Sequence, residues 1–136
     1  MSDTAAASIQ GAKILIVDDT PANLDLLRNI LAPAGYQIFF ATSGESALRV
    51  ATEVLPNLIL LDVMMPRMDG FEACRRLRST AATSTIPIIM VTTRGEPVNV
   101  EAGYDSGCSD YVTKPINSVE LLAKVRHHMA PAAVAP

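Results

Sequence analysis

Short apolar runs alternate with longer segments of helical period through the middle of this chain, and no other feature restricts its fold as much. The runs are rich in β-branched and aromatic residues and are bounded by turn-forming residues, a pattern typical of β-strands. We predict five strands, at Lys13–Val17, Tyr36–Ala41, Asn57–Leu61, Pro87–Val91 and Asp110–Val112.

The segments between these runs repeat their apolar residues every three or four positions, which is the spacing of one face of an α-helix. In the first segment Leu24, Leu27 and Leu31 follow this spacing, Pro21 suits the first turn, and Gly35 follows the end. We predict five helices, at Ala22–Ala32, Glu45–Val54, Gly70–Ser79, Val98–Ser106 and Val119–Met129.

The repeated strand–helix alternation predicts an α/β protein. Strands that are apolar on both faces belong in a parallel sheet, and right-handed crossovers place helices over both of its faces. The expected architecture is therefore a doubly wound parallel sheet of five strands with five helices. Ligands of such open sheets bind beyond the carboxyl ends of the strands, so we look there for functional residues.

The chain has 136 residues, the usual size of one domain. We expect this domain to span residues 12–130, between a polar segment (1–11) and an Ala/Pro-rich tail (131–136) that are both disordered or linker-like. No stretch has the basic start and apolar core of a signal peptide, and none is long and apolar enough for a membrane span. A cytoplasmic protein without membrane insertion is expected.

Charge and motif content exclude several classes of function. A net charge of -3 provides no basic surface for nucleic-acid phosphates, so direct nucleic-acid binding is not expected. The GxxxxGK[ST] and HExxH motifs of nucleotide and zinc hydrolases are absent.

Cys74 and Cys108 belong to no metal-binding motif and are expected to be buried, reduced thiols. His127 and His128 are expected to favour the dipole of the last helix rather than to bind a metal.

Polar residues follow four of the predicted strands at their carboxyl ends. They are Asp18 and Asp19, Asp62, Thr92 and Thr93, and Lys114. Each has an ordinary interpretation by itself, because aspartates often cap helices, threonines often complete turns and lysines are often solvated. Their joint placement at one edge of a parallel sheet favours a functional site.

Three carboxylates in one crevice repel one another, and a bound cation would relieve the repulsion. Mg²⁺ prefers oxygen ligands and is commonly held by one or two carboxylates and a phosphate. A carboxylate can also act as a nucleophile and form an aspartyl phosphate. Asp62, at the end of the most apolar strand, is the expected nucleophile, and Asp18 and Asp19 are better placed to hold the metal. Lys114 and the Thr92 hydroxyl would neutralise the phosphoryl oxygens.

Four segments resemble the CheY-like receiver domain of two-component response regulators, in the same order and over Lys13 to about Met129. They are ILIVDD (Ile14–Asp19), LLDVMMPRMDG (Leu60–Gly70), VT (Val91–Thr92) and DYVTKP (Asp110–Pro115). The resemblance implies a flavodoxin-like strand order, 2-1-3-4-5. It also implies a phosphoacceptor, rather than a turnover enzyme, that is phosphorylated by a histidine kinase or a phosphotransfer protein.

The resemblance gives each site residue a role. Asp62 would be the phosphoacceptor. Asp19, Asp62 and the backbone carbonyl of Met64 would bind Mg²⁺ directly, and Asp18 would act through a metal-bound water. Lys114 would contact the phosphoryl oxygens.

The resemblance also implies a switch. Thr92 and Tyr111 would rearrange on phosphorylation and change the face formed by the fourth helix (98–106), the fifth strand (110–112) and the fifth helix (119–129). An effector protein or domain would bind this face, or a homodimer would form through it. Exposed residues of the first helix would select the kinase, for which we name Asn23, Leu26 and Asn29.

Four local features are relevant to this resemblance, one that agrees with the family and three that could change how the site works. The bond between Lys114 and Pro115 is expected to be cis, as is usual in the family. Thr93 stands where the family commonly has a smaller residue, which could alter access to the phosphorylation pocket. Met64 and Arg94, each two residues beyond a site residue, are expected to hinder hydrolytic water and slow dephosphorylation.

Two other classes of function fit the sequence less well. An aspartyl phosphatase or phosphotransferase acting on free substrates usually has a DxD pair after the first strand, and this chain has none there. A flavodoxin-like cofactor binder needs a Gly- or Ser/Thr-rich phosphate loop at that place, where this chain has two acids. The sequence leaves open whether the receiver is a single-domain regulator or a piece of a hybrid kinase or multidomain regulator.

Overall fold

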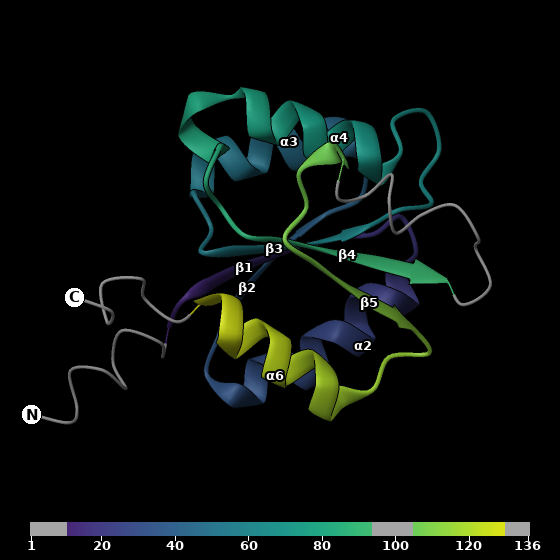
Figure 1. Ribbon diagram of the computed structural model, residues 1–136. Coiled ribbons are helices and arrows are strands. Elements are labelled where there is room, and N and C mark those ends of the chain that lie inside the picture. Colours follow the sequence, from purple (N-terminus) through teal and green to yellow (C-terminus); the bar gives the residue numbers. More distant parts are fainter. Residues whose placement is uncertain (1–10, 94–104, 130–136) are drawn as a thin grey trace, which may run out of the picture.

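The apolar runs form one parallel sheet in the computed structural model, which describes residues 11–93 and 105–129 (Figure 1). The strand order is β2-β1-β3-β4-β5, as the resemblance implied. Central β3 is buried along its whole length, which explains why it is the most apolar run. The strands are β1 (Lys13–Val17), β2 (Gln37–Ala41), β3 (Leu58–Asp62), β4 (Ile88–Thr93) and β5 (Asp110–Lys114).

Three strands extend further than the sequence predicted, so that site residues end the strands instead of following them. Asp62 is the last residue of β3, Thr92 and Thr93 end β4, and Lys114 ends β5. Their polar side chains suggested that each strand stops before them. The ladder is built by the backbone, however, and it continues to Val63, whose N–H donates to the Val91 carbonyl at 3.1 Å.

Helices cover both faces of the sheet, with α2 and α6 on one side and α3 and α4 on the other (Figure 1). Besides the helical residues Asp105 and Ser106, the described part of the chain contains these helices and two short 3-10 turns: α2 (Pro21–Leu31), η1 (Ala32–Ala34), α3 (Gly44–Val54), α4 (Gly70–Ser79), η2 (Ala81–Thr83) and α6 (Ser118–Met129). Among them, no helix of the described residues is long and apolar enough to cross a membrane.

Some predicted segments fall outside the described residues. The predicted helix Val98–Ser106 does so except for Asp105 and Ser106, which are helical. The predicted disordered ends, 1–11 and 131–136, do so except for Gly11, whose N–H donates to the Gly35 carbonyl at 2.8 Å.

The sheet separates two hydrophobic cores, because alternate residues of each strand face opposite sides. Ile59 and Leu61 of β3 pack toward α3 and α4, whereas Leu58 and Leu60 pack with residues of α2 and α6. Burial of each such side chain contributes about 1.5–3 kcal/mol to folding. The core beneath α3 and α4 also contains both cysteines, which are buried free thiols as predicted.

The loop after β3 turns back tightly onto the strand. The Gly70 N–H donates to the Val63 carbonyl at 2.9 Å, and a Cβ at position 70 would clash with the backbone of Asp62 and Val63. Glycine is needed here because only a residue without a side chain allows this approach. Asp69 then caps α4, since its side chain accepts from the Glu72 N–H at 2.9 Å. The contact of this loop with Val63 therefore holds the backbone beside Asp62 in place.

Candidate functional site

Three carboxylates meet at the carboxyl ends of β1 and β3, which are neighbours in the sheet. Val17 is in register with Leu61, so the residues that follow them, Asp18 and Asp62, come side by side. Asp18, Asp19 and Asp62 each offer an oxygen atom, and these atoms lie within 4.8 Å of one another. Asp18 and Asp62 are buried, whereas Asp19 is exposed. The predicted acidic cluster is therefore present.

Lys114 enters this cluster from the end of β5. Its Nζ atom lies 3.5 Å from Oδ2 of Asp18 and 3.6 Å from Oδ1 of Asp62. The two partners are buried and the lysine side chain is only 25% exposed, so water screens these ion pairs less than it screens surface pairs. One ammonium group thus serves two buried carboxylates, and negative charge remains in excess.

Burial and the excess negative charge make Asp62 a weaker acid. Burial raises the pKa of this carboxyl, and repulsion by Asp18 raises it further, to about 6. The Lys114 ammonium and a hydrogen bond from the Met64 N–H lower it, but they do not compensate. A hard divalent cation fits such a site, because it brings two positive charges and prefers carboxylate oxygens.

The Asp18 carboxylate is held by donors from the start of α2. Its Oδ1 atom accepts from the Thr20 N–H at 2.9 Å and from the Asn23 side-chain amide at 3.4 Å, which leaves Oδ2 facing Lys114. Thr20 is the N-cap residue of α2, and its side chain makes no capping hydrogen bond. Asp18 therefore also contacts a charged residue of another strand, which its ordinary interpretation as a residue that begins a helix does not include.

Asn23 was expected to be an exposed residue of the first helix, and this expectation was wrong. Its side chain is partly buried between Asp18 and the neighbouring pocket, while Leu26 and Asn29 are exposed as predicted. The helical period places Asn23 beside Leu27, near the border of the apolar face, but it gives no information about a contact with the preceding strand end. An amide three residues after an N-cap was the only local signal.

The two predicted switch residues lie on neighbouring strands, Thr92 on β4 and Tyr111 on β5. Thr92 is buried near the end of β4, in register with Thr113 of β5. Tyr111 lies near the start of β5, in register with Met90, and packs against the core beneath α3 and α4. The structure thus places the ring on the α4 side of the sheet, and its part in a switch stays a prediction.

The residues expected to affect dephosphorylation are only partly described. Met64 is 61% exposed beside the cluster, and its backbone N–H donates to Oδ1 of Asp62 at 3.4 Å. Arg94 lies outside the described residues. Thr93 is exposed at the end of β4, in register with Lys114.

His128 has a partner that its expected role did not include. The ring Nε2 lies 2.9 Å from Oδ2 of Asp110 at the start of β5, and Lys124 lies 3.2 Å from the other oxygen of the same carboxylate. Burial raises the pKa of Asp110, but the hydrogen bonds from His128, the Tyr111 N–H and Lys124 outweigh it and lower the pKa overall. These contacts connect the last turn of α6 to β5.

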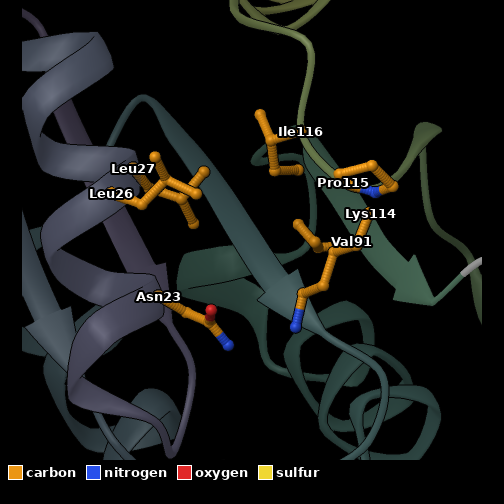
Figure 2. A pocket seen from close by; sticks show the side chains of 7 residues that line it. All are labelled: Asn23, Leu26, Leu27, Val91, Lys114, Pro115 and Ile116. Carbon is orange, nitrogen blue, oxygen red and sulfur yellow. The ribbon is translucent and has the colours of Figure 1, made fainter.

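A pocket of about 230 Å³ opens beside the cluster, between α2 and the loop that follows β5 (Figure 2). The Lys114–Pro115 peptide bond in its wall is cis, as expected from the resemblance. The lining is mainly apolar and comprises Asn23, Leu26, Leu27, Val91, Lys114, Pro115 and Ile116.

Comparison with known families identifies the family of this chain. The family model of the response regulator receiver domain matches residues 14–126, which include the three aspartates of the cluster and Lys114. The chain belongs to this family. It is therefore a receiver domain of the kind found in two-component response regulators.

Curated relatives of this receiver domain are considerably longer proteins. The DNA-binding dual master transcriptional regulator RpaA of Synechocystis is 44% identical over 114 residues, which are 84% of this chain and 47% of RpaA. The response regulator PleD of Caulobacter vibrioides is 46% identical over 118 residues, which are 85% of this chain and 25% of PleD. The chain thus spans half or less of the length of these relatives.

Solved receiver domains have the same fold. The receiver domain of the sensor histidine kinase PA1611 from Pseudomonas aeruginosa superimposes with a TM-score of 0.83 at 29% identity and covers 89% of this chain and 99% of its own. That structure has a magnesium ion coordinated in its active-site cleft. The chemotaxis protein CheY4 of Vibrio cholerae gives a TM-score of 0.80 at 33% identity, with 85% and 97% of the two chains covered.

Proposed function

We propose that this receiver domain accepts a phosphoryl group on Asp62, with Mg²⁺ bound at the acidic cluster, and that it thereby switches a protein-binding face. The observation that carries the proposal is the ammonium of Lys114, which lies within 3.6 Å of both Asp18 and Asp62 beside a third carboxylate. Three carboxylates and one ammonium group lie together at the strand ends. Folding of the sheet alone would not require this cluster of charges.

Asp62 is the nucleophile in this proposal. A carboxylate oxygen attacks the phosphorus atom of a phosphohistidine, the new O–P bond forms as the N–P bond breaks, and the imidazole leaves and takes up a proton. Lys114 is placed to neutralise a phosphoryl oxygen on Asp62, and the Thr92 hydroxyl near the end of β4 is the second proposed donor. Asp19, Asp62 and the Met64 carbonyl would hold Mg²⁺, with Asp18 acting through a water, and the bound ion would neutralise the carboxylates and the phosphoryl group.

The acyl phosphate is then lost by attack of water, which restores the Asp62 carboxylate. The domain consequently carries and releases a phosphoryl group without turning over a free substrate. The exposed side chain of Met64 stands beside Asp62, and we propose that it slows this hydrolysis by limiting the approach of water.

The proposed donor is a histidine kinase or a histidine phosphotransfer protein, and the proposed output partner is an effector protein or domain. The names of the relatives support this range, because they include a DNA-binding regulator and the receiver domain of a sensor kinase. The proposed output face includes Tyr111 on β5 and the exposed side of α6, and a homodimer through this face is an alternative to effector binding.

Phosphoryl uptake can be tested with a small phosphodonor such as acetyl phosphate. The intact mass should increase by one phosphoryl group when Mg²⁺ is present, the adduct should be labile in base, and EDTA should prevent its formation. Asp62→Ala should abolish uptake, whereas Asp25→Ala, which removes an exposed aspartate of α2, should not. If neither acetyl phosphate nor a purified histidine kinase phosphorylates the wild type, the proposed function is wrong.

A further inference from the structure

Asn23 connects the acidic cluster to the pocket beside it. Both Asn23 and Lys114 line the pocket, and both also contact Asp18. Figure 2 shows the two polar groups approaching from opposite walls, the amide from α2 and the ammonium from the end of β5. The same carboxylate is therefore contacted from both sides.

The contacts of Asp18 divide between its two oxygens. Oδ1 receives the Thr20 N–H at 2.9 Å and the Asn23 amide at 3.4 Å, while Oδ2 faces the Lys114 ammonium at 3.5 Å. Without Asn23, the Thr20 N–H would be the one hydrogen-bond donor to Oδ1 among these contacts. The second donor, on the same oxygen and from another direction, restricts rotation of the carboxylate.

The burial of Asp18 increases the effect of losing the Asn23 donor. Asp18 is only 1% exposed, so water has little access with which to replace a donor that is lost. The amide of Asn23 is held in place by the first turn of α2, where its backbone N–H donates to the Thr20 carbonyl at 3.0 Å. A donor on a fixed backbone can set the direction in which a buried carboxylate points.

We propose that Asn23 is a positioning residue, whose amide keeps the Asp18 carboxylate oriented with Oδ2 toward Lys114 and the cation site, and so increases the affinity for Mg²⁺. The proposal rests on the proposed function, since it assigns a role toward the same metal site. Residues that orient metal-binding carboxylates typically change metal affinity by about 10- to 100-fold when they are removed.

The direct test compares Mg²⁺ binding by isothermal titration calorimetry for the wild type, Asn23→Ala and Asn29→Ala. Asn29 is an exposed asparagine of the same helix that does not line the pocket, so its variant controls for the loss of an amide from α2. We expect Asn23→Ala to raise the Mg²⁺ dissociation constant about 10-fold and Asn29→Ala to leave it unchanged. Alanine favours the helix, so the variant should fold.

A second variant and a second readout separate orientation from general stability. Asn23→Leu keeps the size of the side chain and removes the donor, and it should weaken Mg²⁺ binding as much as alanine does. Phosphoryl uptake from acetyl phosphate should be slow for both variants at low Mg²⁺ and should recover largely at saturating Mg²⁺. A purely structural role would instead lower the urea midpoint of unfolding and leave the Mg²⁺ dissociation constant within twofold of the wild type.

The failures of the two proposals can be distinguished. If the wild type binds Mg²⁺ and takes up phosphate, and both Asn23 variants match its Mg²⁺ affinity, the role of Asn23 is wrong and the proposed function stands. If the wild type neither binds Mg²⁺ nor takes up phosphate, the proposed function is contradicted and the inference about Asn23 falls with it.

Discussion

Lys114 and Asp62 approach to 3.6 Å although they end strands that are separated in the sheet by β4. The lysine side chain must therefore reach past the end of β4 to arrive at the carboxylate. Its ammonium is the positive charge that reduces the repulsion among the carboxylates, and it is placed where a phosphoryl group on Asp62 would carry negative oxygens. This relationship gives the first prediction.

Replacing Lys114 with alanine should slow phosphoryl uptake from acetyl phosphate by about 100-fold, because a positioned donor to developing negative charge typically contributes about that much. Mg²⁺ binding should be retained or strengthened, since the competing ammonium has been removed. Rates are measured by intact mass over time at saturating Mg²⁺. Lys13→Ala removes a charge at the opposite end of the sheet and should leave the rate unchanged. Equal rates for wild type and Lys114→Ala would exclude the proposed role.

The affinity for Mg²⁺ should fall as the pH is lowered through about 6. Burial and the neighbouring Asp18 raise the pKa of Asp62 to about 6, so the metal-free carboxyl takes up a proton near that pH, and the cation must then displace the proton. Calorimetric titrations at a series of pH values should show a nearly constant affinity well above this pKa and roughly a tenfold loss for each pH unit well below it. In Asp62→Asn the decline through this range should be absent.

Asp62→Asn should make the metal-free protein more stable at neutral pH. The folded-state pKa lies above the ordinary value of 3.8, so the native state binds more protons than the unfolded state between pH 3.8 and about 6. Stability consequently decreases as the pH rises through this window, and the whole penalty is present above it. Removing the ionisable group should therefore stabilise by about 1–3 kcal/mol at neutral pH.

Urea unfolding in EDTA measures this difference directly. The gain of Asp62→Asn over the wild type should be full at neutral pH and should shrink as the pH approaches the lower end of the window. Mg²⁺ at 100 times its dissociation constant should largely remove this gain, because it stabilises the wild type by about 2.7 kcal/mol, a similar amount. A variant that is less stable than the wild type at every pH would show that Asp62 is not destabilising in the empty site.

The sequence predicted the main parts of the fold and the site for identifiable reasons. Alternating apolar runs determine strands and helices locally, and a parallel sheet necessarily brings residues at its carboxyl ends to one edge, which is why Asp18, Asp62 and Lys114 meet as expected. Strand ends were predicted too early because a polar side chain does not interrupt a backbone ladder.

Contacts between side chains that are distant in sequence were not predictable in the same way. The approach of His128 to Asp110 and the partial burial of Asn23 depend on how α6 and α2 are rotated against the sheet. The period of a helix identifies its buried face, but it does not say which polar residue at the border of that face meets a partner. Arg78 is the clearest case, because no neighbouring residue in the sequence indicates the contacts that its side chain makes.

Arg78 of α4 joins two loops at the end of the sheet opposite to the acidic cluster. Its Nε donates to the Gly107 carbonyl at 2.8 Å, and its Nη1 donates to the carbonyls of Ile86 at 2.6 Å and Ser84 at 3.2 Å. Gly107 has a φ of 101°, and an added Cβ there would lie 2.9 Å from Cγ of Arg78. The guanidinium thus fixes the segments that lead into β4 and β5.

Replacing Arg78 with lysine should destabilise the domain by about 2–4 kcal/mol, because an ammonium cannot reproduce the planar fork of donors and would leave part-buried carbonyls without a partner. Arg76→Lys on the same helix should cost less than about 1 kcal/mol, since Arg76 makes an exposed ion pair with Glu72. Urea unfolding at neutral pH measures both. The Mg²⁺ affinity of the Arg78 variant should equal that of the wild type, because the cation site lies at the other end of the strands. A cost as small as that of Arg76→Lys would mean that water replaces the lost donors and that the two loops hold their positions without the guanidinium.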